Sequence, residues 1–188
     1  MLPIPGYLIT QTLYTGNTST VYRARRETDG CPVVLKILAV PYPPPERIAW
    51  VKREYELTRN LKLPGVVQAY SLELVQERWM MVLEDFGAES LERLGMAGTL
   101  AVPDVLSLAI QIADILGQLH QQHIIHKDIN PSNIVLNPRT GQVKLIDLGI
   151  AAVLSRENPT FRHPDLLEGT LAYISPEQTG RMNRAIDY

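Results

Sequence analysis

The chain has 188 residues, of which 45% are hydrophobic, and a formal net charge of −2 at pH 7. This length predicts one domain, and a nearly neutral chain without a basic run is not typical of proteins that bind nucleic acid or an anionic membrane surface. The single cysteine, Cys31, excludes a disulfide within the chain and fits a reducing compartment, so we expect a cytoplasmic protein. We recognise neither a signal peptide nor a membrane-spanning segment in the sequence.

The N-terminal part of the chain is predicted to form a small antiparallel sheet. Residues 7–13 and 20–26 are strand candidates, and the Asp-Gly pair at 29–30 predicts a hairpin turn before a third strand over 31–40. A further strand is expected over 79–83, and it is followed by an acidic, glycine-containing connection.

Lys36 lies in the third of these strands, and Glu54 lies in a helix that the spacing of apolar residues predicts over 46–62. Alternation places Lys36 on the same face as Val34 and Leu38, so its amine needs an anionic partner there. Glu54 falls beside the inward stripe of the helix and is the natural partner. In the alternative interpretation, the Lys36 amine reaches water and Glu54 belongs to the exposed face of the helix.

Residues 103–120 give the clearest helical pattern, because apolar side chains recur every three or four positions along two flanks. A helix that is apolar nearly all round is expected to be buried, like the central helix of a lobe. His120, His123 and His126 follow one another at spacings of three, but the helical pattern ends near Gln121. The three rings therefore need not share a face, and the pattern does not favour a zinc site.

Two apolar segments, 134–137 and 142–146, flank the turn sequence Pro-Arg-Thr-Gly and predict a tight hairpin. In such a hairpin Asn133 at the entrance and Asp147 at the exit lie side by side. A carboxylate beside an amide oxygen suits magnesium held jointly with phosphate oxygens, and Asp128 lies at the same mouth. The alternative is a surface hairpin with ordinary polar ends.

The most informative string is His-Lys-Asp at 126–128 with Asn133, followed by Asp-Leu-Gly at 147–149. It resembles the H-R-D-x-x-x-x-N catalytic loop and the D-F-G metal loop of the eukaryotic-like serine/threonine protein kinases. Val-Val-Leu-Lys at 33–36 stands where that family has its strand-borne lysine, and residues 169–177 are similar to the end of its activation segment. The resemblance covers residues 7–188. In detail the chain is similar to the kinase domains that head large bacterial chains with an ATPase module and sensor or histidine-kinase domains.

This resemblance implies an α+β, bilobal protein-kinase-like fold. Residues 1–84 would form the N-lobe, with a small antiparallel sheet and one helix, and residues 85–88 would form the hinge. Residues 89–188 would form a mainly helical C-lobe with the catalytic loop, the metal loop and the activation segment. The family continues into several more helices after the position of Glu177. We therefore expect an incomplete, C-terminally truncated C-lobe that belongs to a longer protein or is completed by a separate chain.

The resemblance also implies ATP and Mg²⁺ as cofactors and a protein substrate. Asp128 would orient the substrate hydroxyl, and Asn133 and Asp147 would hold the magnesium ion. Lys36, fixed by Glu54, would hold the α and β phosphates. The family pattern further implies that Thr170 helps to set the choice of a hydroxyl substrate. The nucleotide-binding residues that it implies are Gly16, Val21, Val34, Lys36, Val135 and the backbone of Glu84 and Phe86.

Three departures from the family pattern keep a second interpretation open. Asn130 stands where serine/threonine kinases carry a lysine, Lys127 replaces an arginine, and the sequence stops eleven residues after Glu177. In addition, Gly16 is the one glycine left of three in the phosphate loop. The leading hypothesis is an ATP-dependent serine/threonine protein kinase domain acting on a protein substrate or on downstream domains of a longer chain. The alternative is a catalytically weak or inactive kinase-like module for binding or regulation. The segment 169–177 disfavours a small-molecule phosphotransferase.

Overall fold

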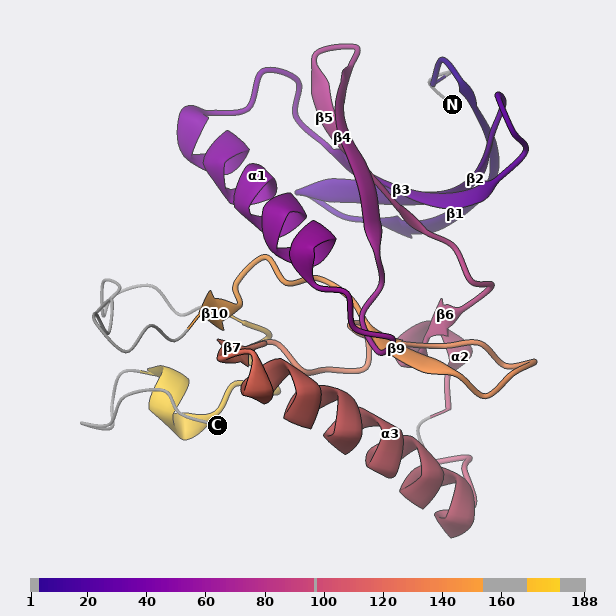
Figure 1. The fold of residues 1–188 in the computed structure, drawn as a ribbon, viewed down its shortest axis with the longest axis vertical. Helices are drawn as coiled ribbons and strands as arrows, with labels where there is room; N and C mark the ends of the chain where they lie inside the picture. Colours follow the sequence, from indigo (N-terminus) through magenta and orange to yellow (C-terminus); the bar gives the residue numbers. More distant parts are fainter. Residues whose placement is uncertain (1–3, 97, 154–168, 180–188) are drawn as a thin grey trace. The chain divides into compact units, whose positions relative to one another are not determined.

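The computed structural model describes residues 4–96, 98–153 and 169–179. It divides into two compact units, which Figure 1 shows as ribbons. Unit 1 comprises residues 1–62 and 67–88, and unit 2 comprises residues 63–66 and 89–188. Each unit is described by itself below. An antiparallel sheet with one helix forms the first, and short strands with helices form the second, so the predicted α+β, bilobal fold class is confirmed.

Unit 1 is built on a five-stranded antiparallel sheet with the order β1-β2-β3-β5-β4. Both predicted hairpin strands and the third strand are present, and the prediction at 79–83 falls inside β5. Alternation decides the two faces of the sheet: Val33 and Leu35 in β3 are fully buried on one face, whereas Lys36 points to the other. The strands are β1 (Tyr7–Thr15), β2 (Ser19–Arg26), β3 (Pro32–Leu38), β4 (Ala69–Val75) and β5 (Arg78–Glu84).

Helix α1 (Pro45–Asn60) packs against β4 and β5 in unit 1. Pro45 occupies the first turn, where its fixed φ suits the helix and its missing N–H costs no hydrogen bond. The buried positions are Val51, Glu54 and Thr58, which follow one another at helical spacing. Glu54 therefore lies on the inward stripe, as one of the two interpretations of the sequence required.

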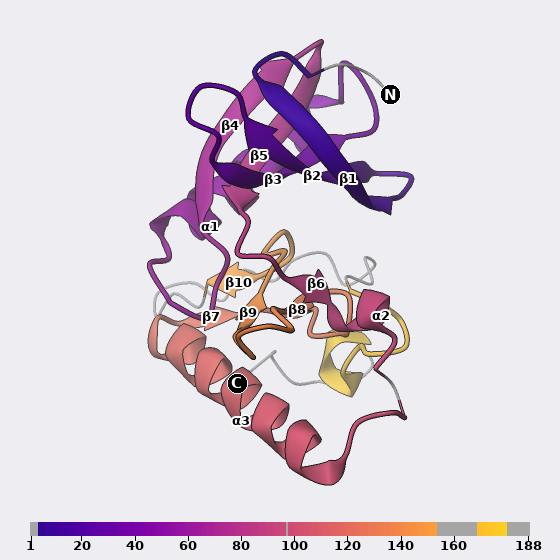
Figure 2. The ribbon, with the colours of Figure 1, turned by 90° about the vertical axis from the view of Figure 1, so that its right-hand side faces the viewer.

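Unit 2 presents two short sheets and a long helix, which Figure 2 shows together. One sheet has the order β6-β8-β9 and the other pairs β10 with β7. The predicted hairpin is present, and β8 and β9 pair from Ile134 opposite Leu145 to Leu136 opposite Val143. The elements are β6 (Glu89–Ser90), α2 (Leu91–Leu94), α3 (Val102–Gln121), β7 (Ile124–Ile125), β8 (Ile134–Leu136), β9 (Val143–Leu145), β10 (Ala152–Val153) and the 3-10 turn η1 (Pro176–Thr179).

The long helix α3 forms where it was predicted, but the prediction that it is buried all round is wrong. Only Ile115 and Leu119 are buried, whereas Leu106 is 56% exposed and Ile110 is 69% exposed. The reason is that α3 packs against β7 and β9, and no other described helix or strand packs against it. By length and composition α3 would be long enough to cross a membrane, a weak criterion that core helices of soluble proteins also meet.

Gln111 of α3 fixes the hairpin that carries part of the candidate site. Its side-chain amide donates to the carbonyl of Gly141 at 3.2 Å, and its oxygen accepts the N–H of Val143 at 3.3 Å. Inside the turn, the side chain of Asn137 accepts the N–H groups of Arg139 and Thr140. The turn is therefore fixed both by Gln111 of α3 and by its own Asn137, and this fixes the register of β8 and β9.

Gly65 allows residues 63–66 to approach α3 closely. Its carbonyl accepts the N–H of Leu145 at 2.8 Å, and a Cβ at this position would lie 2.2 Å from Cγ1 of Ile115. We expect Gly65→Ala to lower the free energy of unfolding by about 1–3 kcal/mol, because a buried side chain must move. Denaturant unfolding measures this change. The matched control is Gly117→Ala in α3, where the new methyl group meets nothing within 4 Å. It should stabilise the helix by roughly 0.5–1 kcal/mol, and an equal loss in both variants would contradict the packing argument.

Candidate functional site

In unit 1 the structure brings Lys36 and Glu54 together. The amine of Lys36 lies 2.7 Å from Oε1 of Glu54, and the two side chains are 20% and 10% exposed. Thr58 supports the helix at this point, because its hydroxyl donates to the carbonyl of Glu54 at 2.7 Å. A half-buried ion pair of this kind holds a lysine amine in one place. The alternative in which Lys36 and Glu54 both turn to water is wrong.

Two of the other unit 1 residues predicted to bind nucleotide, Val21 and Val34, share the Lys36 face of the sheet. Val21 lies directly opposite Lys36, and Val34 lies directly opposite Arg23, so these four side chains project from the same face. Gly16 closes the turn between β1 and β2, and its N–H donates to the carbonyl of Ser19 at 3.0 Å. A Cβ on Gly16 would lie 2.3 Å from the hydroxyl oxygen of Tyr14, so the ring of Tyr14 covers this glycine.

Glu84 is fixed at the end of β5 by a reciprocal pair of bonds with Gln68. Its N–H donates to the carbonyl of Gln68 at 2.9 Å, and its side chain accepts the N–H of Gln68 at 3.2 Å. Phe86 follows in the connection after β5, and the N–H of Gly87 is accepted by the side chain of Asp85 at 2.9 Å. The backbone on both sides of Phe86 is therefore ordered by side chains of unit 1.

In unit 2, Asp128 is the centre of a hydrogen-bonded group. Its Oδ1 accepts both the N–H and the hydroxyl of Thr170, each at 2.9 Å. Its Oδ2 accepts the side-chain amide of Asn133 at 2.8 Å. The Thr170 bonds show that this carboxylate oxygen is placed to accept a hydrogen bond from an aliphatic hydroxyl. The structure thus brings Asp128, Asn133 and Thr170 together, a contact with Thr170 that the sequence did not predict.

Asn133 and Asp147 lie at the open end of the β8–β9 hairpin, with a register one residue different from the expected one. Asn133 lies opposite Ile146, whose N–H donates to the carbonyl of Asn133 at 3.0 Å, and Asp147 is the next residue. Asp147 has a positive φ of 64°, and its Oδ1 accepts the N–H of Gly149 at 3.3 Å. This left-handed conformation turns the chain sharply after the strand.

A carboxylate and an amide oxygen at one end of a hairpin fit a magnesium ion. Mg²⁺ is bound by one or two carboxylates together with water and substrate phosphates, and it does not need a cage made only of protein ligands. No group of three or more His, Cys, Asp or Glu side chains suited to a metal occurs among the described residues. Asp147 and Asn133 supply the donor set that such a shared ion requires. The three-histidine zinc alternative finds no support in these residues.

His126 fixes the loop that contains Asp128 through contacts of both its ring nitrogens. The ring is 1% exposed, its Nε2 lies 3.0 Å from the carbonyl oxygen of Ile146, and its Nδ1 accepts the N–H of Asp128 at 3.3 Å. An acceptor at Nδ1 requires the proton on Nε2, which donates to Ile146. Burial lowers the pKa of His126, against the opposing effects of the Ile146 bond and the nearby aspartates. The ring is therefore expected to be neutral near pH 7.

This depressed pKa predicts a loss of stability at acid pH. Above the ordinary His pKa of 6.5 the ring is neutral in both states, and below it the unfolded chain binds the proton first. The free energy of unfolding should therefore fall as the pH drops from 6.5 through the lower pKa of the folded protein. Denaturant unfolding between pH 8 and pH 5 measures the slope. The His126→Gln variant cannot titrate here, and a slope as steep as that of the wild type would contradict the assignment.

Asn130 holds the loop between Asp128 and Asn133 and is 4% exposed. Its Oδ1 accepts the N–H groups of Ser132 and Asn133 at 2.9 and 3.2 Å. Its amide nitrogen donates to the hydroxyl of Thr170 at 3.1 Å. The sequence indicated only that a cation is missing at this position. In the structure, Asn130 instead holds the loop backbone by hydrogen bonds, and it donates to the Thr170 hydroxyl that also binds Asp128.

Two sets of residues with a role near these groups were not predicted from the sequence. Gln178 donates from its side chain to the carbonyl of Lys127 at 2.8 Å, and no local pattern indicates this contact across 51 positions. Arg23 in β2 contacts Asp85 after β5. The Asp-x-Gly sequence at 85–87 is a turn signal that could have drawn attention to Asp85. Val135, the remaining predicted residue, is buried in β8 of unit 2.

Comparisons with known proteins show the family to which the chain belongs. The family described as "Protein kinase domain" matches residues 7–187. The chain is similar to the serine/threonine-protein kinase PrkC of Bacillus subtilis, with 31% identity over 92% of this chain and 26% of that protein. It is 30% identical to the probable serine/threonine-protein kinase pknA2 of Bifidobacterium longum, over 91% of this chain and 23% of that protein. A third relative is the serine/threonine-protein kinase dkf-2 of Caenorhabditis briggsae, with 30% identity over 94% of this chain and 15% of that protein. The chain spans about a quarter or less of the length of these relatives.

Proposed function

Because this chain belongs to the protein kinase domain family, we propose that it transfers the γ-phosphate of ATP to serine or threonine hydroxyls of a protein substrate. Its membership of the family and its serine/threonine kinase relatives support this proposal, which is the leading hypothesis drawn from the sequence. ATP is the phosphate donor of this family. Mg²⁺, the individual residue roles and the nature of the substrate are part of the proposal.

The observation that carries the proposal is the Asp128–Thr170 contact. A hydroxyl O–H donates to Oδ1 of Asp128 at 2.9 Å, which is the interaction that a substrate serine or threonine would need while its oxygen attacks phosphorus. Asp128 is the proposed group that orients this hydroxyl and accepts its proton. Asn133 donates to the second carboxylate oxygen and so supports its orientation.

Unit 1 is proposed to hold the nucleotide through the Lys36 face of its sheet. Lys36, positioned by Glu54 at 2.7 Å, would neutralise the α and β phosphates. The adenine would contact Val21 and Val34, and the backbone of Glu84 and Phe86 would bind its edge. Gly16 would lie near the phosphates. From unit 2, Val135 would add an apolar contact.

Asn133 and Asp147 are the residues that would hold Mg²⁺ through their side-chain oxygens. The ion would supply neutralisation of charge on the phosphate oxygens during transfer. Phosphoryl transfer demands little covalent chemistry from the protein, so positioning and charge account for most of the rate. Thr170, whose N–H and hydroxyl both bind Asp128, is proposed to shape the site for a hydroxyl substrate.

Residues 1–84, 85–88 and 89–188 are proposed as N-lobe, hinge and C-lobe, and a cytoplasmic location remains our prediction. The substrate is proposed to be a separate protein or downstream domains of a longer chain. Neither a nucleic acid nor a membrane is proposed as a partner. The alternative of an inactive kinase-like module is not favoured by the comparisons, although Asn130 departs from the family pattern at the site itself.

Transfer of label from γ-labelled ATP tests the proposal. The chain should label a general acceptor protein in the presence of Mg²⁺, and Asp147→Ala should abolish labelling because the metal loses its carboxylate. A matched control is Asp29→Ala, which removes an exposed carboxylate in the β2–β3 turn of unit 1. Equal labelling by the wild type and Asp147→Ala would overturn the proposal. Binding of Mg·ATP without any transfer would support the inactive module.

A further inference from the structure

We propose that Arg23 is a positioning residue that fixes the conformation of residues 85–88 and thereby sets the affinity of unit 1 for the adenosine part of ATP. The inference deepens the proposed function and rests on it. Residues 85–88 follow β5 and contain the backbone groups proposed to bind the nucleobase edge. Arg23 lies in β2, 62 positions before Asp85.

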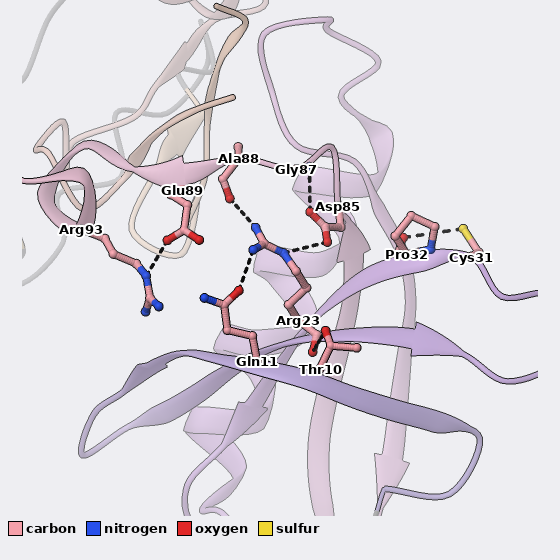
Figure 3. Close-up of polar contacts among 10 residues, drawn as sticks. All are labelled: Thr10, Gln11, Arg23, Cys31, Pro32, Asp85, Gly87, Ala88, Glu89 and Arg93. Carbon is pink, nitrogen blue, oxygen red and sulfur yellow. Dashed lines mark hydrogen bonds and ion pairs between the residues drawn. The ribbon is translucent and has the colours of Figure 1, made fainter. Parts of the chain in front are cut away.

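The guanidinium of Arg23 uses all three nitrogens to join three segments of unit 1 (Figure 3). Its Nε donates to Oδ2 of Asp85 at 2.9 Å, and its Nη2 donates to the carbonyl of Ala88 at 2.6 Å. Its Nη1 donates to the side-chain oxygen of Gln11 in β1 at 2.7 Å. One rigid planar group therefore binds both ends of the segment 85–88 and connects this segment to the sheet.

Asp85 extends this network into the segment itself. While its Oδ2 binds Arg23, its Oδ1 accepts the N–H of Gly87 at 2.9 Å. Gly87 has a φ of 76°, a left-handed conformation that glycine adopts without strain. The side chain of Asp85 is only 6% exposed and that of Arg23 is 20% exposed. Loss of the arginine would leave a nearly buried carboxylate without its cation, which is far more costly than loss of a surface ion pair.

The position of Arg23 on the sheet connects this network to the nucleotide. Arg23 lies directly opposite Val34 and two residues after Val21, on the face that also carries Lys36. Its donors are directed to Gln11, Asp85 and Ala88, so it acts on the segment 85–88. Recognition of a base edge by backbone groups depends on their position to within about 0.5 Å. We therefore expect Arg23 to influence binding of adenosine and not binding of the triphosphate.

The experiment compares Arg23→Ala and Arg23→Lys with Arg25→Ala in the full 188-residue chain. Arg25 is the matched control, because it lies in the same strand, is exposed, and donates to the carbonyl of Gly30 at 3.2 Å. Amide hydrogen exchange reports the order of residues 84–88 in the free protein. Inhibition constants of adenosine and of inorganic tripolyphosphate, with KM for ATP and kcat, report the two parts of nucleotide binding.

Arg23→Ala should speed exchange at Gly87 and raise both KM for ATP and the inhibition constant of adenosine by about tenfold. The inhibition constant of tripolyphosphate and kcat should stay within about twofold of the wild type, because the phosphate-binding and catalytic groups are elsewhere. Arg23→Lys should bind adenosine more tightly than Arg23→Ala but less tightly than the wild type. Lysine keeps the positive charge but cannot make the three hydrogen bonds of the guanidinium in the same geometry. Arg25→Ala should match the wild type throughout.

Unchanged exchange at residues 84–88 in Arg23→Ala would overturn the inference. Faster exchange with unchanged adenosine affinity would also overturn it, because Arg23 would then be only structural. If Arg23→Ala does not fold, Asp85→Asn takes its place: it keeps an acceptor for Gly87 but removes the charge that faces Arg23. If the wild type binds no nucleotide, the proposed function fails and the positioning role with it, and exchange then decides only whether Arg23 orders the segment.

Discussion

Asp128→Asn is expected to lower kcat for phosphate transfer by about a thousandfold, while the Kd of Mg·ATP stays within about twofold of the wild type. The amide keeps the shape of the carboxylate and can still accept the Thr170 hydroxyl, but it cannot take up a proton. It also presents a donor toward either Thr170 or Asn133, both of which donate to the carboxylate of Asp128. We expect the main loss in the chemical step, because Asp128 itself is proposed to bind neither the nucleotide nor the metal.

Labelled-phosphate transfer and calorimetric titration with Mg·ATP separate the two effects. Asp114→Asn is a suitable control, because Asp114 is exposed on α3 and accepts a hydrogen bond from Gln118 that asparagine can preserve. The control should retain the rate of the wild type. A rate in Asp128→Asn close to that of the wild type would remove Asp128 from the catalytic role, whatever the affinity for ATP.

Asn130→Ala is expected to lower the free energy of unfolding by about 2–4 kcal/mol. The side chain is buried, and its oxygen accepts the N–H groups of Ser132 and Asn133. Asn133 is buried, so its N–H left without an acceptor costs roughly 1–3 kcal/mol, and loss of the bond at the exposed Ser132 adds about 1 kcal/mol. We also expect kcat to fall by about ten- to a hundredfold, because Asn133 and Thr170 both lose a contact that orients them around Asp128.

Denaturant unfolding with kcat at saturating ATP measures both consequences. Asn60→Ala, at the exposed end of α1, is the matched control and should change unfolding by less than about 0.5 kcal/mol. If Asn130→Ala and Asn60→Ala have the same stability, the loop does not depend on this side chain. A lysine at position 130, as in related kinases, cannot accept hydrogen bonds. Asn130→Lys would therefore lose the two hydrogen bonds from the N–H groups of Ser132 and Asn133.

Local rules predicted much of the fold and part of the site. Alternation in β3 and helical spacing in α1 made Glu54 a candidate partner for Lys36, and the structure decides for this pair over the alternative in which both side chains reach water. The β8–β9 hairpin followed from two apolar segments and one turn, although the register at Asn133 differs by one residue. These features depend on contacts between neighbouring elements, which sequence periodicity encodes directly.

Other features depend on contacts that no local pattern encodes. The Asp128–Thr170 bond joins residues 42 positions apart, and the family pattern, not the spacing, drew attention to Thr170. The Arg23 network spans 62 positions, and a polar residue in a half-buried strand does not indicate its partner. The exposure of α3 was predicted wrongly, because an apolar pattern shows which side chains of a helix can be buried. It does not show whether other elements pack against those side chains.

The apolar side chains on the N-terminal half of α3 have a consequence for handling the protein in solution. Leu106 and Ile110 are both more than half exposed on one helix. Salts such as sulfate and phosphate strengthen the association of such surfaces, because they are excluded from the protein surface. Self-association through this helix should therefore grow with the concentration of these salts. Kinetic assays in dilute chloride buffers should report the properties of the dispersed chain more faithfully.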